Sequence, residues 1–127
     1  MASTFIFHND FSLQSLNDLY DSDYLMIEEV FTSVLEELGP LTDNVLACFT
    51  AGDLAGLKGA VHKIKPLFGF TGLLSIESLC LQFENSCQQS ASTDQLATEF
   101  SGLYAALQQG RTILAAEKER LILFNHP

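Results

Sequence analysis

The feature that most constrains the fold of this chain is the regular spacing of its apolar residues. In the stretch that ends near Gly72, apolar residues recur three and four positions apart: Leu54, Leu57, Val61, Ile64 and Phe68. This spacing is typical of one face of an α-helix and does not fit the alternation of a β-strand. Similar stripes run through most of the chain, and no strand-like alternation is found. The sequence therefore predicts an all-α protein.

Four long amphipathic segments are expected, at 22–51, 53–70, 73–89 and 93–120, after a short helix from Phe11 to about Tyr20. Short loops make consecutive helices antiparallel neighbours, which predicts an antiparallel up-down four-helix bundle with a short extra N-terminal helix. Asp10 or Ser12 is expected to cap the short helix, and Asp53 the third one. Pro40 either begins a new helix or kinks a longer one.

A chain of 127 residues suits one domain spanning 1–127, with a bundle core at about 22–120. Residues 1–9 and 121–127 are predicted to be terminal extensions. Both are partly apolar, and they either cover one end of the bundle or mediate a dimer.

The formal charge of −10 argues against binding of nucleic acid or of anionic membranes, because both repel an acidic surface. No apolar run approaches the ~20 residues that span a bilayer, and the N-terminus does not resemble a signal peptide. Three cysteines without CxxC spacing do not suggest a disulfide framework, and Cys80 and Cys87 are expected to be buried, reduced thiols. We therefore expect a cytoplasmic protein.

His62 is the candidate functional residue. At about 100° per residue it points roughly 130° away from the apolar face of its helix, toward solvent. Compact and basic residues share its side of the helix: Ala55, Lys58, Gly59, Lys65, Pro66 and Gly69. Glycine and proline weaken a helix, and on the exposed side they bury nothing. Access for a partner therefore explains their presence on this side better than helix stability does. Three of the six basic residues, Lys58, Lys63 and Lys65, lie near His62 in a chain that has none before Lys58, which predicts a small positive field.

The segment around His62 resembles the signature of histidine-containing phosphotransfer (HPt) domains, Ala-His-x-x-Lys-Gly with a further glycine ten residues after the histidine. His62, Lys65 and Gly72 match the histidine, the lysine and the last glycine, and Gly69 matches an intermediate glycine. Val61 stands where alanine is usual, and Pro66 where glycine is usual. Because proline has no N–H, we predict a slight bend at Pro66 and a His62 carbonyl without its helical partner.

The resemblance implies that the chain is a phosphocarrier without kinase activity of its own. His62 would accept a phosphoryl group from the aspartyl phosphate of a receiver domain and pass it to another receiver. Lys65 would neutralise phosphoryl charge, with Lys58 as a possible helper. The residues expected to contact the partner are Lys58, Gly59, Pro66 and Gly69, and exposed apolar residues such as Leu25 or Met26 would extend this surface. Expected partners are response-regulator receiver domains and a hybrid sensor histidine kinase, and the chain is expected to be a monomer.

Other chemistry finds no support in the sequence. No Glu-x-x-His pair, CxxCH, HExxH or glycine-rich nucleotide loop occurs, so we expect neither a cofactor nor a metal site on this chain. Any Mg²⁺ is expected on the receiver partner. The alternative function is a non-catalytic helical bundle that serves interaction or dimerisation through its apolar termini.

Overall fold

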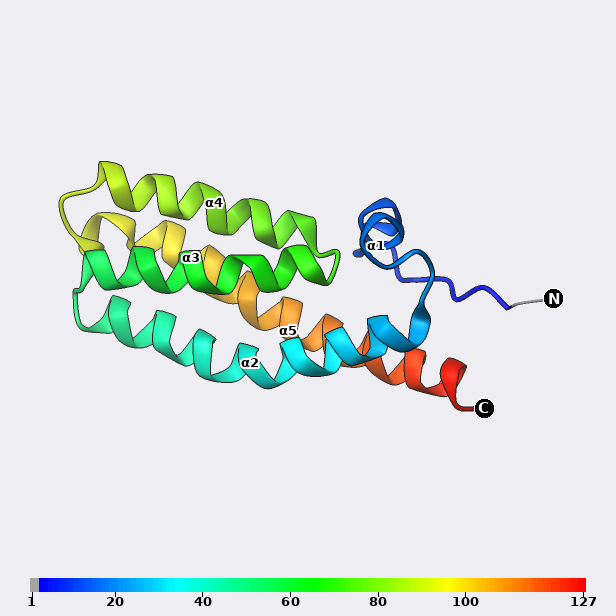
Figure 1. The fold of residues 1–127 in the computed structure, drawn as a ribbon. Coiled ribbons are helices and arrows are strands. Elements are labelled where there is room, and N and C mark those ends of the chain that lie inside the picture. Colours follow the sequence, from blue (N-terminus) through cyan, green and yellow to red (C-terminus); the bar gives the residue numbers. More distant parts are fainter. Residues whose placement is uncertain (1–2) are drawn as a thin grey trace.

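The computed structural model describes residues 3–127, which form five α-helices and one 3₁₀ turn. The elements, in chain order, are α1 (Leu13–Tyr20), α2 (Tyr24–Thr50), α3 (Leu54–Phe70), α4 (Leu74–Gln89), η1 (Thr93–Leu96) and α5 (Ala97–Asn125). Helices α2 to α5 run alternately in opposite directions, and α1 lies across one end of the bundle (Figure 1). Residues 3–127 contain no strand, and the predicted all-α bundle with an extra N-terminal helix is confirmed. Nor does any of these helices combine the length and the apolar character that crossing a bilayer requires.

Side-chain caps fix where α1 and α3 begin. The Ser12 hydroxyl accepts a hydrogen bond from the Ser15 N–H (3.2 Å), so Ser12 and not Asp10 caps α1. The Asp53 carboxylate accepts one from the Gly56 N–H (2.9 Å) at the start of α3, as predicted. Each cap satisfies a backbone donor that the first helical turn leaves without a partner.

Glycines in the left-handed region end α2 and α3. Gly52 has φ of +70° and Gly72 has φ of +76°, a conformation that side chains disfavour. Beyond Gly72 the chain turns back, and the Leu73 N–H donates to the Phe68 carbonyl (2.9 Å). The turn at Gly72 therefore fixes how α4 approaches α3.

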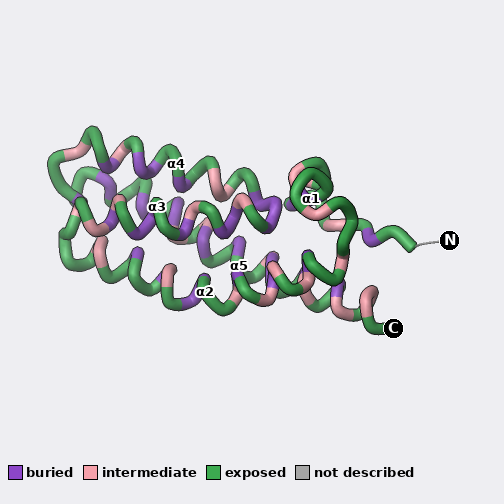
Figure 2. The backbone as a smooth tube through the Cα atoms, in the orientation of Figure 1, coloured by how far each residue is buried: buried purple, intermediate pink, exposed green. Residues whose placement is uncertain are grey.

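Helix α2 continues through Pro40 as a single helix, which resolves the alternative left open by the sequence. The core lies between the four long helices, where buried positions face inward (Figure 2). Helix α3 packs against α2 and α4, and α5 packs against the same two helices from the other side. The largest fully buried side chains include Phe31 from α2, Phe68 from α3, Phe83 from α4 and Leu107 from α5.

The two ends of the chain belong to the core, so the prediction that 121–127 is an extension beyond the last helix was wrong for most of its residues. Helix α5 continues to Asn125, and Leu121 is fully buried. Phe5 is buried as well, with its ring centroid 5.4 Å from that of Phe124 and the Arg120 guanidinium 5.0 Å above its ring. Of the two roles considered for the apolar ends, covering one end of the bundle is the one that the structure shows.

The cysteines are free thiols, and Cys80 and Cys87 are buried on α4 as the sequence predicted. Burial is the main cause that raises the pKa of the Cys80 thiol to about 12. The nucleophilic thiolate form is therefore scarce at neutral pH, and Cys80 packs as a small apolar residue.

Gly110 allows α5 to approach α3 and α4 closely. A Cβ at this position would lie 2.5 Å from Ile76 Cδ1 and 3.1 Å from Phe68 Cε1. Gly110→Val is therefore expected to destabilise the protein by about 1–3 kcal/mol through overpacking. Gly102→Val on the same helix is the control, because nothing lies within 4 Å of a Cβ there. Thermal unfolding measures both, and equal melting temperatures would contradict the close packing at Gly110.

Candidate functional site

His62 projects from the middle of α3 into solvent, and its side chain is 71% exposed. The helix phase produces this orientation, because Val61 and Ile64 on either side of it are fully buried. Gly59, one turn earlier, has open space where a Cβ would be. The exposed imidazole predicted from the sequence is confirmed.

The buried carboxylate of Glu84 holds the inner side of the imidazole. Its Oε1 lies 2.6 Å from His62 Nδ1, and its Oε2 accepts a hydrogen bond of 2.6 Å from Lys65 Nζ. The Glu84 side chain is only 8% exposed. An ionised carboxylate can only accept hydrogen bonds, so we assign the ring proton to Nδ1. The lone pair of Nε2 is then left on the outer side of the ring.

Helix α4 brings Glu84 to this position because it packs along α3. Glu84 shares the buried side of α4 with Cys80, Phe83 and Cys87. A buried carboxylate is costly unless it is paired and hydrogen-bonded, and His62 and Lys65 supply those partners. Glu84 was not predicted from the sequence. The available signal was an acid one turn after Cys80, on the apolar face of its helix.

The positive field predicted around His62 is smaller than expected. Lys65 is paired with Glu84, which cancels much of its charge, although the pairing also places its ammonium near His62. Lys58 Nζ donates to the Gln88 Oε1 (3.2 Å) on α4, one turn further along the seam between α3 and α4. Lys63 is exposed and makes no ion pair within residues 3–127. Lys65 is thus part of a His62–Glu84–Lys65 triad, whereas Lys58 and Lys63 keep their positive charge without an ion-pair partner within residues 3–127.

The remaining predicted contact residues lie on one side of His62 along α3. Pro66 is exposed one turn away, and Gly69 is half-buried one turn further. Both line a surface hollow between α1, α3 and α4. Helix α3 continues through Pro66, and the predicted bend there stays a prediction.

Phe70, at the end of α3, is an apolar residue whose side chain is 49% exposed. It lines the hollow that contains Pro66 and Gly69, and also a second hollow between α2 and α3. Met26 lines this second hollow, whereas Leu25 is exposed but lines neither. An exposed aromatic side chain about two helical turns from His62, beside two hollows, is typical of surfaces that bind another protein.

The other two histidines lie near the chain termini, away from this triad. His8 pairs with Asp10 (2.9 Å), and His126 pairs with Glu28 (3.0 Å). Within residues 3–127, no group of three or more His, Cys, Asp or Glu side chains is arranged to hold a metal ion.

Comparison with known proteins agrees with this geometry. The family model of the Hpt domain matches residues 26–110, which include α3 and Glu84 of α4, and the chain belongs to this family. Its fold is similar to the crystal structure of the HPT domain from a sensor hybrid histidine kinase of Shewanella, with a TM-score of 0.73 and 14% sequence identity. The similarity covers 84% of this chain and 92% of that one. No curated protein matches the chain. Membership of this family implies histidine-containing phosphotransfer in a phosphorelay.

Proposed function

We propose that His62 is the phosphoryl acceptor of this domain, and that it receives the group from an aspartyl phosphate on a receiver domain and passes it to a second receiver. The observation that carries the proposal is the exposed imidazole whose Nδ1 is bound to the buried Glu84. Because Nδ1–H is directed to Glu84, the lone pair of Nε2 faces solvent and is the nucleophile open to a partner.

The transfer proceeds by in-line displacement. The Nε2 lone pair forms a bond to phosphorus while the bond to the aspartate oxygen breaks, and the aspartate leaves as a carboxylate. The phosphorylated ring carries a positive charge, with its proton on Nδ1. The Glu84 carboxylate stabilises that charge and keeps the ring oriented, as buried carboxylates do behind other reactive histidines.

Lys65 is proposed to neutralise the phosphoryl oxygens. One of its three N–H bonds is directed to Glu84, which leaves two for the phosphoryl group. Its side chain is 21% exposed, and its ammonium is held by the same carboxylate that holds the His62 ring. The reactive aspartate and the divalent cation are expected on the receiver, and the chain acts as a phosphocarrier rather than as a kinase.

The proposal is tested by incubating the full chain with receiver domains that carry a radioactive aspartyl phosphate. Label is expected to move to this chain in an acid-labile, base-stable linkage, which distinguishes phosphohistidine from phosphoserine and from aspartyl phosphate. A second, unlabelled receiver is then expected to remove the label. If no receiver of the source organism donates label to the chain, the phosphocarrier role is wrong and a non-catalytic interaction module is left.

Phe70 is proposed as an apolar contact of the docked receiver. Phe70→Ala is expected to lower the kcat/KM of transfer about tenfold, because exposed aromatic residues at the centre of an interface often contribute 1–2 kcal/mol or more. The fold should survive, since the Tyr20 hydroxyl bonds the backbone carbonyl of Phe70 and not its ring.

Leu46→Ala is the matched control for Phe70→Ala. Leu46 is an exposed leucine of α2 that lines neither hollow at Phe70. Both variants are assayed with the same phosphorylated receiver. Equal rates for the two would remove Phe70 from the docking surface.

A further inference from the structure

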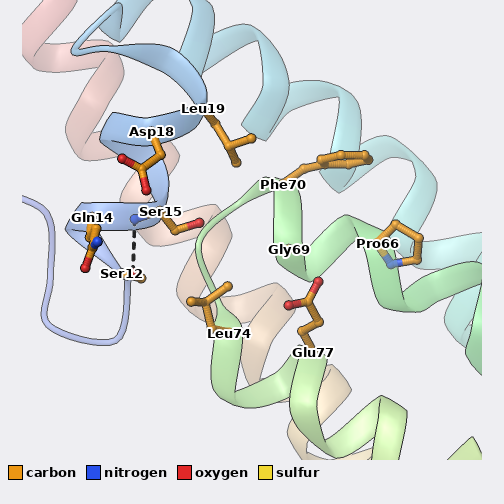
Figure 3. A pocket seen from close by; sticks show the side chains of 10 residues that line it. All are labelled: Ser12, Gln14, Ser15, Asp18, Leu19, Pro66, Gly69, Phe70, Leu74 and Glu77. Carbon is orange, nitrogen blue, oxygen red and sulfur yellow. Dashed lines mark hydrogen bonds between the residues drawn. The ribbon is translucent and has the colours of Figure 1, made fainter.

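The hollow next to the triad is the strongest remaining feature of the surface. It is an open surface hollow with a volume of about 500 Å³, lined by α1, by the end of α3 and by the start of α4 (Figure 3). Its edge begins at Pro66, one helical turn or about 5–6 Å along the axis from His62. A receiver that places its aspartate at the His62 ring therefore also covers this hollow.

Two carboxylates face the hollow, Asp18 from α1 and Glu77 from α4, and they lie on different sides of it (Figure 3). Neither forms an ion pair or accepts a side-chain hydrogen bond within residues 3–127, and no Lys, Arg or His lines the hollow. Glu77 is half-buried, and its carboxyl group occupies the space that a Cβ at Gly69 would need. The hollow thus carries two negative charges, and no basic side chain within residues 3–127 neutralises them.

The walls between the two carboxylates are largely apolar. Leu19, Phe70 and Leu74 are exposed there at 50%, 49% and 37%. Lysine and arginine side chains bury their alkyl part against such surfaces while the charged end reaches a polar partner. The ring of Phe70 offers a further contact for a cation. Apolar walls with carboxylates at the edge fit a long basic side chain better than they fit a purely apolar one.

We propose that this hollow receives a lysine or arginine side chain of the docked receiver domain, and that Asp18 and Glu77 select receivers which carry that side chain. The inference rests on the proposed function, because the receiver is the occupant. It adds a basis for partner choice. The two carboxylates attract a receiver that carries a basic side chain at this position, and they repel a receiver that carries an acidic one.

The test compares two double variants that remove the same charge. Asp18→Asn/Glu77→Gln removes both carboxylates of the hollow, and Asp43→Asn/Glu119→Gln removes two exposed carboxylates outside it. The probe is the unphosphorylated receiver domain that binds the wild-type chain most tightly in a screen of the receivers of the source organism, and the dissociation constant is measured by calorimetry at low and high salt. The hollow variant is expected to bind about fivefold to tenfold more weakly at low salt, with a smaller difference at high salt. The control is expected to stay within about twofold of wild type.

A variant with the two charges of the hollow reversed provides a second test. Asp18→Lys/Glu77→Lys is expected to prevent measurable binding, and changing the matching basic residue of the receiver to glutamate is expected to restore it. Equal affinities of the two neutralised variants would overturn the inference, and so would a wild-type chain that binds no receiver. Binding does not need the nucleophile, so charge-dependent binding without transfer of label would contradict the proposed function alone.

Discussion

His62→Gln is expected to abolish phosphorylation of the chain, with a loss of roughly a thousandfold or more in the rate of label transfer from a phosphorylated receiver. The amide nitrogen of glutamine has no available lone pair, so it cannot replace the imidazole Nε2 as a nucleophile. Glutamine can still donate a hydrogen bond to the Glu84 carboxylate, which keeps that buried group satisfied. The loss is therefore expected without a loss of fold, as circular dichroism and the melting temperature would show.

His126→Gln is the matched control for His62→Gln. His126 is also an exposed histidine paired with a glutamate, but it lies at the end of α5 beside Glu28. This variant should accept label at the wild-type rate. Label that persists in His62→Gln, or that disappears in His126→Gln, would place the phosphoryl acceptor elsewhere.

Glu84→Ala is expected to slow transfer about tenfold to a hundredfold, the size of effect seen when an oriented catalytic group loses its partner. Without the carboxylate the ring rotates more freely, and its proton distributes between Nδ1 and Nε2. The phosphorylated ring also loses the negative charge that stabilises its positive charge. Lys65 loses its partner at the same time, since Oε2 of Glu84 holds its ammonium.

Glu84→Gln separates orientation from charge. Its amide oxygen still accepts from Nδ1–H, whereas the negative charge that stabilises the phosphorylated ring is gone. We expect this variant to transfer faster than Glu84→Ala. The nitrogen chemical shifts of the His62 ring give a second readout that stability does not affect: the Nδ1–H tautomer should dominate in wild type and Glu84→Gln but not in Glu84→Ala. Identical tautomer populations in all three proteins would show that Glu84 does not position the ring.

Apolar periodicity was sufficient to predict the helices because each one has a single buried face. The end of α5 was missed for a physical reason. Glu117 occupies the buried stripe between Leu114 and Leu121, so the apolar pattern ended where the helix did not. The structure shows that Glu117 is 2% exposed and is bound by Arg120 and by the His8 N–H. One of these partners, His8, lies near the N-terminus, 109 residues away in the sequence, so the local apolar pattern around Glu117 does not reveal it.

Part of the candidate site was predictable from the sequence: the exposure of His62 was, and its pairing with Glu84 was not. Helix phase alone indicates that His62 is exposed, since the flanking apolar residues define the buried face. Glu84 was not predicted, because an acid in an amphipathic helix is usually solvated, and its partners lie on another helix about 20 residues earlier. The positive field inferred from the three lysines was likewise reduced at Lys65, which pairs with Glu84 across the seam. Properties that depend on one helix follow from the sequence, whereas pairings between helices require the fold.

The most direct measurement is the position of the phosphoryl group on the phosphorylated chain, determined by phosphorus and nitrogen NMR with the His62 ring isotopically labelled. The structure predicts one phosphorylated nitrogen, Nε2 of His62, because Nδ1 is bound to the buried Glu84 carboxylate. A phosphoryl group on Nδ1, on another residue, or on no residue after incubation with phosphorylated receivers would contradict the assignment of His62 Nε2 as the acceptor.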